Sequence, residues 1–265
     1  MYSKFQLSFK WLKYYMLASN RKGHGIHSPF VYELVSEVLN DKSSYYAYKK
    51  IEIIKKNLRS DNRILKIIDL GAVGERNGVS VKKISALAAN AVSTEKFGRL
   101  LFRLANFYRS ATIFELGSSL GISTAYLASA DSLSRVLTIE GSASVSEIAK
   151  ENFQQLGLKN IIQVVGNFED VLSNQLALNP PPDLVFIDGN HRKRPVLEYF
   201  EQFLNNISSS SLIIIHDIHW SWEMEEAWAI IQANPRVKMS IDIFSAGLVF
   251  FREEFQVKQH FKIRF

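Results

Sequence analysis

Short apolar runs that alternate with helical patterns occupy the chain from residue 111 onwards. The apolar runs cover residues 111–116, 135–140, 161–165, 183–188 and 211–216, and helical patterns fit between them at 121–131, 143–157, 168–176 and 192–206. Parallel strands need long crossover connections, which helices usually provide. The alternation therefore predicts an α/β fold, a parallel sheet with helices on both faces.

Two further strands are predicted near the end of this region, at 237–243 and 246–252. Only a few residues around Ser245 and Gly247 separate them. A connection that short joins antiparallel strands. We therefore expect a Rossmann-like, mostly parallel sheet that ends in an antiparallel hairpin.

The first 108 residues contain mainly helical patterns. Residues 3–18 have an imperfect 3.6-residue period, Ser28 can cap a helix over 29–39, and residues 43–59 and 79–108 have helical character. We expect a helical N-terminal extension over 1–108, followed by the sheet domain over 109–265. This extension could be a packing arm, a lid over the site or, less readily, a membrane-surface helix.

The basic charge of the chain is concentrated near its start. The net charge is +6, and residues 1–65 hold 12 Lys and Arg against five Asp and Glu. A solvated helical face is the simplest interpretation, with a patch for an anionic substrate, nucleic acid or a membrane as the alternatives.

Cysteine is absent from the sequence. This excludes disulfides and thiolate zinc sites, and it fits a reducing cytosol. The first residues lack the pattern of a signal peptide, and no apolar run approaches the roughly 20 residues that span a bilayer. We expect a soluble, cytoplasmic protein without a membrane span.

Two segments combine an apolar run with a glycine turn, at 67–74 and 113–124. A ligand-binding turn also needs a helix after it and an acid at the end of the next strand, about 20 residues on. Only the second segment meets these conditions, with Glu140 as the acid. The first is interpreted as a structural turn or short strand.

The glycines of the second segment, Gly117 and Gly121, are spaced Gly-x-x-x-Gly. Gly117 permits a tight turn, and Gly121 lets the next helix pack close to the strand. Ser123 and Thr124 could meet free N–H groups of the first helical turn. A pyrophosphate favours a denser glycine pattern, so this spacing suits an adenosyl ligand without phosphate.

Five motifs then follow in order at the ends of predicted strands. They are residues 115–124, Glu140, 166–170, 186–191 and 216–218. They resemble the ordered motifs of class I S-adenosylmethionine-dependent methyltransferases, in particular the O-methyltransferase-like branch with an Ile-Asp-Gly-x-His element. Residues 23–30, Gly-His-Gly-Ile-His-Ser-Pro-Phe, resemble the leader of a bacterial subgroup. The core resemblance covers about residues 110–252 and implies a seven-stranded sheet whose last strand is antiparallel.

The resemblance also implies S-adenosylmethionine as cofactor, and it assigns roles to residues at the strand ends. Glu115 and the loop of Gly117, Ser118 and Gly121 would hold the methionine part, Glu140 the ribose, Phe168 and Glu169 the adenine, and Asp188 the methionine amine or the acceptor.

Methyl transfer from a sulfonium is an in-line displacement, so the enzyme mainly positions the reactants. An oxygen acceptor also benefits from a base or a metal ion. The predicted catalytic residues are Asp188, His191, Asp217 and His219, which lie beyond the fourth and fifth strands. His191 would be a base, a hydrogen-bond donor or a structural contact, and His219 could line an acceptor pocket or simply pack. For His216, at the end of an apolar run, a core role is favoured.

Asp188 and Asp217 could also offer oxygen ligands to Mg²⁺. The metal-dependent catechol-type branch has asparagine directly after the second acid, whereas this chain has Ile218. His219 would suit Mn²⁺ or Zn²⁺ better than Mg²⁺. We therefore favour a site without metal, with a bound divalent ion as the alternative.

We expect methyl transfer to an oxygen of a small-molecule acceptor. The sequence leaves open the identity of the acceptor and the oligomeric state, for which a homodimer is one alternative. Two alternatives stay open at this point. One is an NAD-dependent oxidoreductase on the same fold, and the other is a non-enzymatic, nucleic-acid-binding protein with a methyltransferase-like core. The nearly neutral core argues against nucleic acid.

Overall fold

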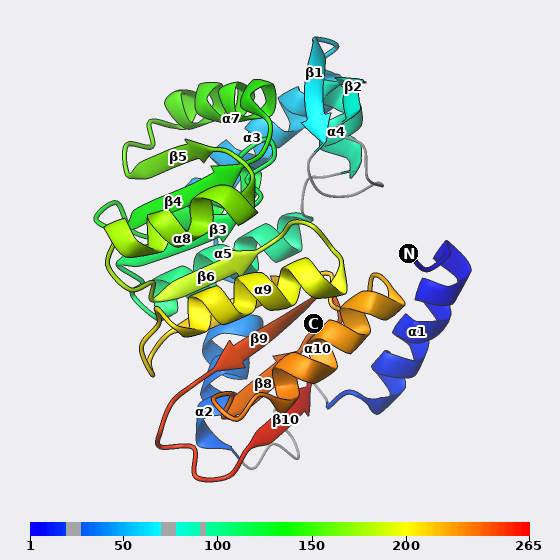
Figure 1. Cartoon of the computed structure of the whole chain (residues 1–265), viewed down its shortest axis with the longest axis vertical. Helices are drawn as coiled ribbons and strands as arrows, with labels where there is room; N and C mark the ends of the chain where they lie inside the picture. The colour runs from blue at the N-terminus through cyan, green and yellow to red at the C-terminus, as the bar shows by residue number, and fades with distance from the viewer. Residues whose placement is uncertain (20–27, 70–77, 91–93) are drawn as a thin grey trace. The chain divides into compact units, whose positions relative to one another are not determined.

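The computed structural model describes residues 1–19, 28–69, 78–90 and 94–265. Residues 23–27 of the Gly-His-Gly-Ile-His-Ser-Pro-Phe segment and residues 70–74 of the first glycine segment lie outside these residues. The chain divides into two compact units (Figure 1). Unit 1 comprises Met1–Asp41 and Pro181–Phe265, and unit 2 comprises Lys42–Pro180.

Unit 2 contains three parallel strands and the helices that cover them. Its elements are α3 (Tyr46–Ser60), β1 (Ile64–Asp69), β2 (Gly78–Lys83), α4 (Ile84–Asn90), α5 (Glu95–Phe107), β3 (Thr112–Leu116), α6 (Ile122–Ala128), β4 (Arg135–Glu140), α7 (Ala143–Leu156), β5 (Ile161–Val165) and α8 (Phe168–Leu178). Side chains of α3, α5, α6 and α7 form one buried cluster, which includes Tyr48, Phe102, Tyr126 and Phe153. The apolar faces of these helices thus bury one another.

Strands β1 and β2 form a separate two-stranded antiparallel sheet. The strand at the start of the first glycine segment is confirmed, but the helix predicted from residue 79 is wrong for residues 79–83. Val79 and Val81 are β-branched and favour a strand, and residues 78–83 pair in register with residues 64–69. The helix begins only at Ile84.

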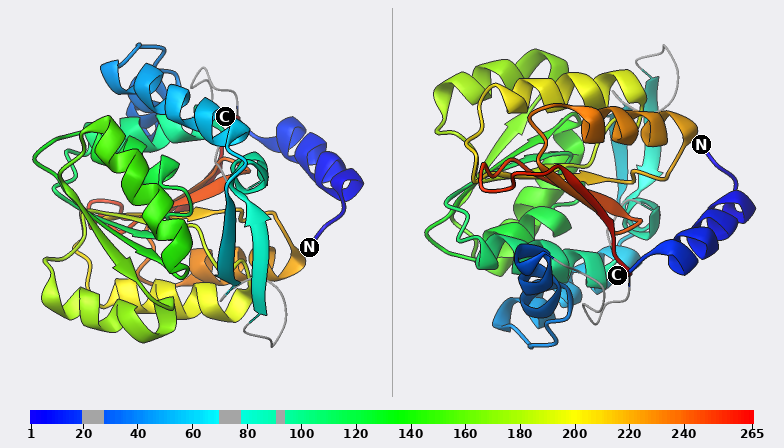
Figure 2. Two further views of the ribbon diagram at one scale, coloured as in Figure 1. Left: turned by 90° about the horizontal axis from the view of Figure 1, so that it is seen from above. Right: turned by 90° about the horizontal axis from the view of Figure 1, so that it is seen from below.

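Unit 1 combines the start of the chain with its last third. Its elements are α1 (Lys4–Leu17), α2 (Pro29–Glu33), the π-helix η1 (Leu34–Leu39), β6 (Leu184–Ile187), α9 (Lys193–Leu204), β7 (Leu212–His216), α10 (Trp222–Ala233), β8 (Met239–Asp242), β9 (Ala246–Phe250) and β10 (Gln259–Lys262). Within this unit, α9 and α10 cover one face of the strands and α2 lies on the other (Figure 2).

The main sheet has eight strands in the order β10-β8-β9-β7-β6-β3-β4-β5. Strand β9 is antiparallel to both β7 and β8, which confirms the predicted hairpin, and β10 is parallel to β8. The Rossmann-like α/β class is confirmed. The sheet exceeds the seven strands implied by the resemblance because β10 adds a strand at its edge.

The strand registers place the predicted site residues at carboxyl ends. In unit 2, Leu116 is paired with Ile139 and Glu140 with Val165. In unit 1, Ile187 is paired with Ile215, so the residues that follow β6 lie beside the end of β7. Open parallel sheets bind their ligands at this edge.

Candidate functional site

The glycine turn after β3 has an unusual backbone. Gly117, Ser119 and Gly121 have φ angles of 95°, 46° and 81°, and Gly117 N donates to Ile139 O at 2.9 Å. A Cβ at Gly121 would lie 2.5 Å from the Phe153 ring. Positive φ at a non-glycine residue such as Ser119 costs on the order of 1–3 kcal/mol, and such residues gather at functional sites. The turn therefore holds Ser119 in a strained backbone conformation of the kind that is frequent at functional sites.

Glu140 ties the end of β4 to this turn. Its Oε2 accepts a hydrogen bond from Ser119 N at 2.9 Å, and its Oε1 accepts one from Ser142 N at 3.0 Å. Each carboxylate oxygen can accept more than one hydrogen bond. The side chain is thus fixed at the end of β4 by two backbone amides.

Glu115 lies beneath the turn in the interior of unit 2. Its Oε2 accepts hydrogen bonds from Thr138 Oγ1 at 2.6 Å and from Thr124 Oγ1. Thr124 therefore points towards β3, whereas the sequence analysis assigned it to the free N–H groups of the helix. Ser123 is also buried, in the first turn of α6. Among the described residues, the buried Ser118 Oγ has no hydrogen-bond partner.

Phe168 and Glu169 open helix α8, just after β5. Gly166 N donates to Glu140 O at 3.0 Å, which brings this connection to the end of β4. Phe168 is half-buried and Glu169 is exposed. Unit 2 thus holds the predicted cofactor residues except Asp188, which lies in unit 1; Glu115, Ser123 and Thr124 are buried behind the turn.

In unit 1, two acids and two histidines lie together after β6 and β7. His216 Nδ1 is 2.9 Å from Asp188 Oδ1 and 3.7 Å from Asp217 Oδ1, and His191 Nε2 is 3.7 Å from Asp188 Oδ1 and 4.0 Å from Asp217 Oδ2. The structure therefore brings three of the four predicted catalytic residues into one cluster.

The charges of this cluster support one another. Burial alone would lower the pKa of His216, but the adjacent Asp188 carboxylate outweighs it and raises this pKa to about 9. Burial alone would raise the pKa of Asp188, but the His216 imidazolium lowers it below its ordinary value. The pair is therefore a carboxylate and an imidazolium at neutral pH.

His216 is the member of the cluster that the sequence analysis placed in the core. Its ring packs edge-on against Phe186, as a core residue would, but the side chain is still 16% exposed. His216 therefore lies at the boundary between the core and the candidate site. The signal available in the sequence was the parallel register, since the residue that ends β7 lies beside the residue that follows β6.

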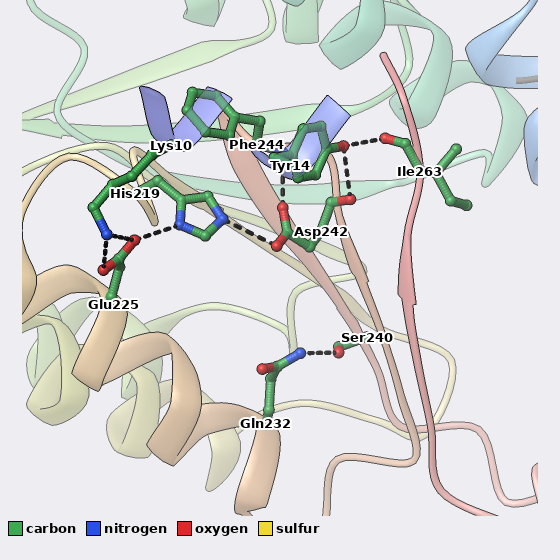
Figure 3. Close-up of polar contacts among 9 residues, drawn as sticks. All are labelled: Lys10, Tyr14, His219, Glu225, Gln232, Ser240, Asp242, Phe244 and Ile263. Carbon is green, nitrogen blue, oxygen red and sulfur yellow. Dashed lines mark hydrogen bonds and ion pairs between the residues drawn. The ribbon is translucent and has the colours of Figure 1, made fainter. Parts of the chain in front are cut away.

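His219 lies in a different network of unit 1 (Figure 3). Its Nδ1 is 2.9 Å from Glu225 Oε1, and its Nε2 is 3.0 Å from Asp242 Oδ2. Lys10 Nζ also contacts Glu225, at 2.8 Å. Burial alone would lower the pKa of His219, but the two carboxylates raise it. Both ring nitrogens are therefore held by acids, and the side chain fastens the loop after β7.

Asn190 and Asp217 have positive φ angles of 51° and 55° and follow β6 and β7 closely. Together with Ser119, they place strained non-glycine backbone after three of the strands that carry predicted site residues.

Among the residues that the structure describes, no group of three or more His, Asp or Glu side chains could hold a metal ion. No helix in the described ranges is long and apolar enough to cross a bilayer.

A mostly parallel α/β sheet, a glycine turn after β3 and an acid at the end of β4 are features of the Rossmann-like class of α/β proteins. Within that class, residues 114–218 match the family model of a methyltransferase domain.

Two curated relatives are similar over part of the chain. A catechol O-methyltransferase of Niastella koreensis is 30% identical over 124 residues, which are 46% of this chain and 55% of the relative. One of Mycobacterium tuberculosis is 30% identical over 130 residues, 48% of this chain and 57% of the relative. The chain thus spans little more than half the length of these relatives.

Among solved structures, the SAH-bound methyltransferase PaMTH1 of Podospora anserina has a similar fold, with a TM-score of 0.60 and 14% identity. The match covers 85% of this chain and 97% of that one. These findings confirm the resemblance to class I S-adenosylmethionine-dependent O-methyltransferases, and none of them favours an oxidoreductase or a nucleic-acid-binding protein.

Proposed function

We propose that the chain is an S-adenosylmethionine-dependent methyltransferase that transfers the methyl group to an oxygen of a small-molecule acceptor. The observation that carries the proposal is the Glu140 carboxylate, held at the end of β4 by the Ser119 amide of the glycine turn. Matches to O-methyltransferases support the reaction class.

The residues of unit 2 fit such a cofactor. Glu140 can accept both hydroxyls of a ribose, and Phe168 offers an aromatic edge beside β5 for a purine. Ser118 Oγ, buried and without a partner among the described residues, can bind a polar group of the methionine part. When bound, S-adenosylmethionine supplies an electrophilic methyl group on sulfur.

The cluster of unit 1 fits the acceptor step. Asp188 and Asp217 give this edge a negative character, which suits a cationic or hydroxyl-bearing ligand. His191 Nε2 lies outside hydrogen-bond distance of both acids, so its imidazole is the group in the cluster that can take a hydroxyl proton. We assign Asp188 and Asp217 to ligand orientation, and His216 to holding Asp188 in place.

Titration calorimetry with S-adenosylmethionine and its demethylated product tests the proposal. Wild-type protein should bind both, and Glu140→Gln should bind about tenfold or more weakly, since a charged hydrogen-bond acceptor becomes neutral. Glu147→Gln, on the exposed surface of α7, is the matched control and should bind as wild type does. Binding of NADH without S-adenosylmethionine, or equal affinity of the two variants, would contradict the proposal.

Turnover with labelled methyl donor then addresses the acceptor. Catechols come first in the screen because the curated relatives carry that name. His191→Ala should keep its cofactor affinity and lose about 100-fold or more in turnover.

Metal independence stays a prediction, which activity after dialysis against EDTA would test. A cytoplasmic location and a homodimer are further proposals, the first supported by the absence of cysteine.

A further inference from the structure

Helix α1 is held on unit 1 by one of its faces. Tyr14 is buried, and its hydroxyl donates to Asp242 O at 3.2 Å and to Ile263 O, while Lys10 pairs with Glu225 at 2.8 Å. Figure 3 shows both side chains pointing from α1 into the His219 network. Leu7, which is half-buried, and Ala18, which is buried just after the helix, lie on the same face. This face is the attachment of α1.

The opposite face of α1 carries an apolar stripe. Phe5, Phe9, Leu12 and Met16 are spaced by four, three and four residues, so at about 100° per residue they fall within roughly 60° of one another and opposite Tyr14. Their exposed fractions are 83%, 65%, 49% and 65%. We call these four residues the outer stripe.

Positive charge borders the outer stripe. Lys4 and Lys13 are exposed and lie about a quarter turn to either side of it. Arg264 lies at the end of the helix, over the Tyr15 ring at 4.3 Å. Helix α1 contains no acid, and the first acid of the whole sequence is Glu33. The nearby Glu225 is already paired with Lys10 and His219 on the attachment face.

We propose that the outer stripe docks on an anionic lipid bilayer, with α1 lying in the plane of the headgroups. Buried apolar side chains and lysines at the edges of the apolar face are what such binding requires. Exposed Trp11 stacks on Tyr15 with ring centroids 5.2 Å apart, and these residue types favour the membrane interface. With 14 residues, α1 is about 21 Å long and cannot cross the roughly 30 Å core.

A second copy of the chain fits the stripe less well. The spacing of the outer stripe would suit a pair of packed helices. Two α1 helices would, however, bring their lysines together, and neither helix has an acid to neutralise that positive charge. An anionic bilayer provides both the apolar medium and the opposite charge. A single short helix binds weakly, so docking is reversible and sensitive to salt.

Sedimentation of the full chain with vesicles tests the proposal. Wild-type protein should bind vesicles of three parts phosphatidylcholine to one part phosphatidylglycerol, and should bind pure phosphatidylcholine at least about tenfold more weakly. The double variant Phe5→Ser/Phe9→Ser should lose about tenfold or more in partitioning, from lost apolar burial. Lys4→Glu/Lys13→Glu should lose at least about 25-fold, or fivefold for each lysine.

The controls are Leu133→Ser, at a side chain that is 90% exposed in unit 2, and Lys159→Glu, also exposed in that unit. Both should bind vesicles as wild type does, and circular dichroism checks that every variant is folded. Equal partitioning of stripe and control variants would overturn the proposal, as would absence of binding by wild type. The proposal would also be overturned if wild type formed a dimer in analytical ultracentrifugation, the Phe5→Ser/Phe9→Ser variant were monomeric, and neither protein bound vesicles.

Discussion

A histidine and a carboxylate at the ends of β7 and β6 form the most tightly coupled ion pair of the candidate site. His216 and Asp188 are both largely buried, and burial disfavours the charge of each. The attraction between the two charges, at 2.9 Å from His216 Nδ1 to Asp188 Oδ1, outweighs this cost of burial. Each residue therefore stabilises the ionised form of the other. The charge of the site near Asp188 therefore depends on a residue that need not touch a ligand.

This pair predicts a pH-dependent contribution to stability. Because the pKa of His216 is raised to about 9 in the folded protein, its contribution is fully present below about pH 6.5 and is lost as pH rises through 9. The stability difference between wild type and His216→Asn should therefore shrink by up to about 3 kcal/mol between pH 6 and pH 10. Urea unfolding of both proteins at the two pH values measures it, and a constant difference would refute the assignment.

At this scale the sequence reveals positions better than contacts. Asp188 and Asp217 follow apolar runs, so their placement at strand ends could be predicted. The two acids that hold His219 could not, because Glu225 and Asp242 are brought to it by α10 and β8. Pairing of titratable groups depends on tertiary packing, and one-dimensional spacing does not encode it.

At the scale of elements, two glycines at helix ends allow a controlled comparison. Gly121 begins α6 and Gly157 ends α7, with φ angles of 81° and 70°. A Cβ at Gly121 would meet Phe153 at 2.5 Å and Ala149 at 3.0 Å, whereas nothing lies within 4 Å at Gly157. Both glycines have a left-handed backbone, but only Gly121 is also surrounded by packed side chains.

Gly157→Ala should therefore cost about 1–2 kcal/mol of unfolding free energy, the penalty of a side chain in this conformation. Gly121→Ala should cost a further 1–3 kcal/mol or so, because the packed Phe153 ring must move. Urea unfolding of the two variants against wild type gives the difference. Equal losses would show that the start of α6 does not pack against α7 as described.

The prediction of elements succeeded where burial imposes a pattern. Strands β3 to β7 consist mainly of buried or half-buried residues and form apolar runs in the sequence, and their bounds agree with the predicted ranges within a residue at each end. Strand β10 was missed because three of its four residues are exposed and Phe261 is its single apolar residue, which is too few for an apolar run. Helix α10 was also missed, although Ser221 caps it and Met224, Ala227, Trp228 and Ile231 recur at helical spacing on its buried side.

At the scale of the whole molecule, contacts join the two ends of the chain. Ser19 N donates to Lys262 O at 2.7 Å, and Tyr2 N donates to Trp220 O at 3.1 Å. Such pairings leave no local signal in the sequence, whereas the division at residue 108 was predicted from the local change from helical patterns to alternating strands and helices. By compactness, Met1–Asp41 groups with Pro181–Phe265. The attachment of α1 is thus a long-range property.

This attachment predicts how the chain responds to loss of a single ion pair. Lys10→Met removes the cation between α1 and Glu225, which is partly shielded from solvent. Such a pair contributes up to about 1 kcal/mol, so the amides of α1 should exchange hydrogen about fivefold faster. Lys13→Met, on the same helix but exposed, should leave their exchange unchanged. Mass spectrometry of hydrogen exchange should also show unaltered protection in β3 to β5, because those strands belong to the other unit. Acceleration of equal size in both variants would mean that helix propensity, and not the contact with Glu225, keeps α1 ordered.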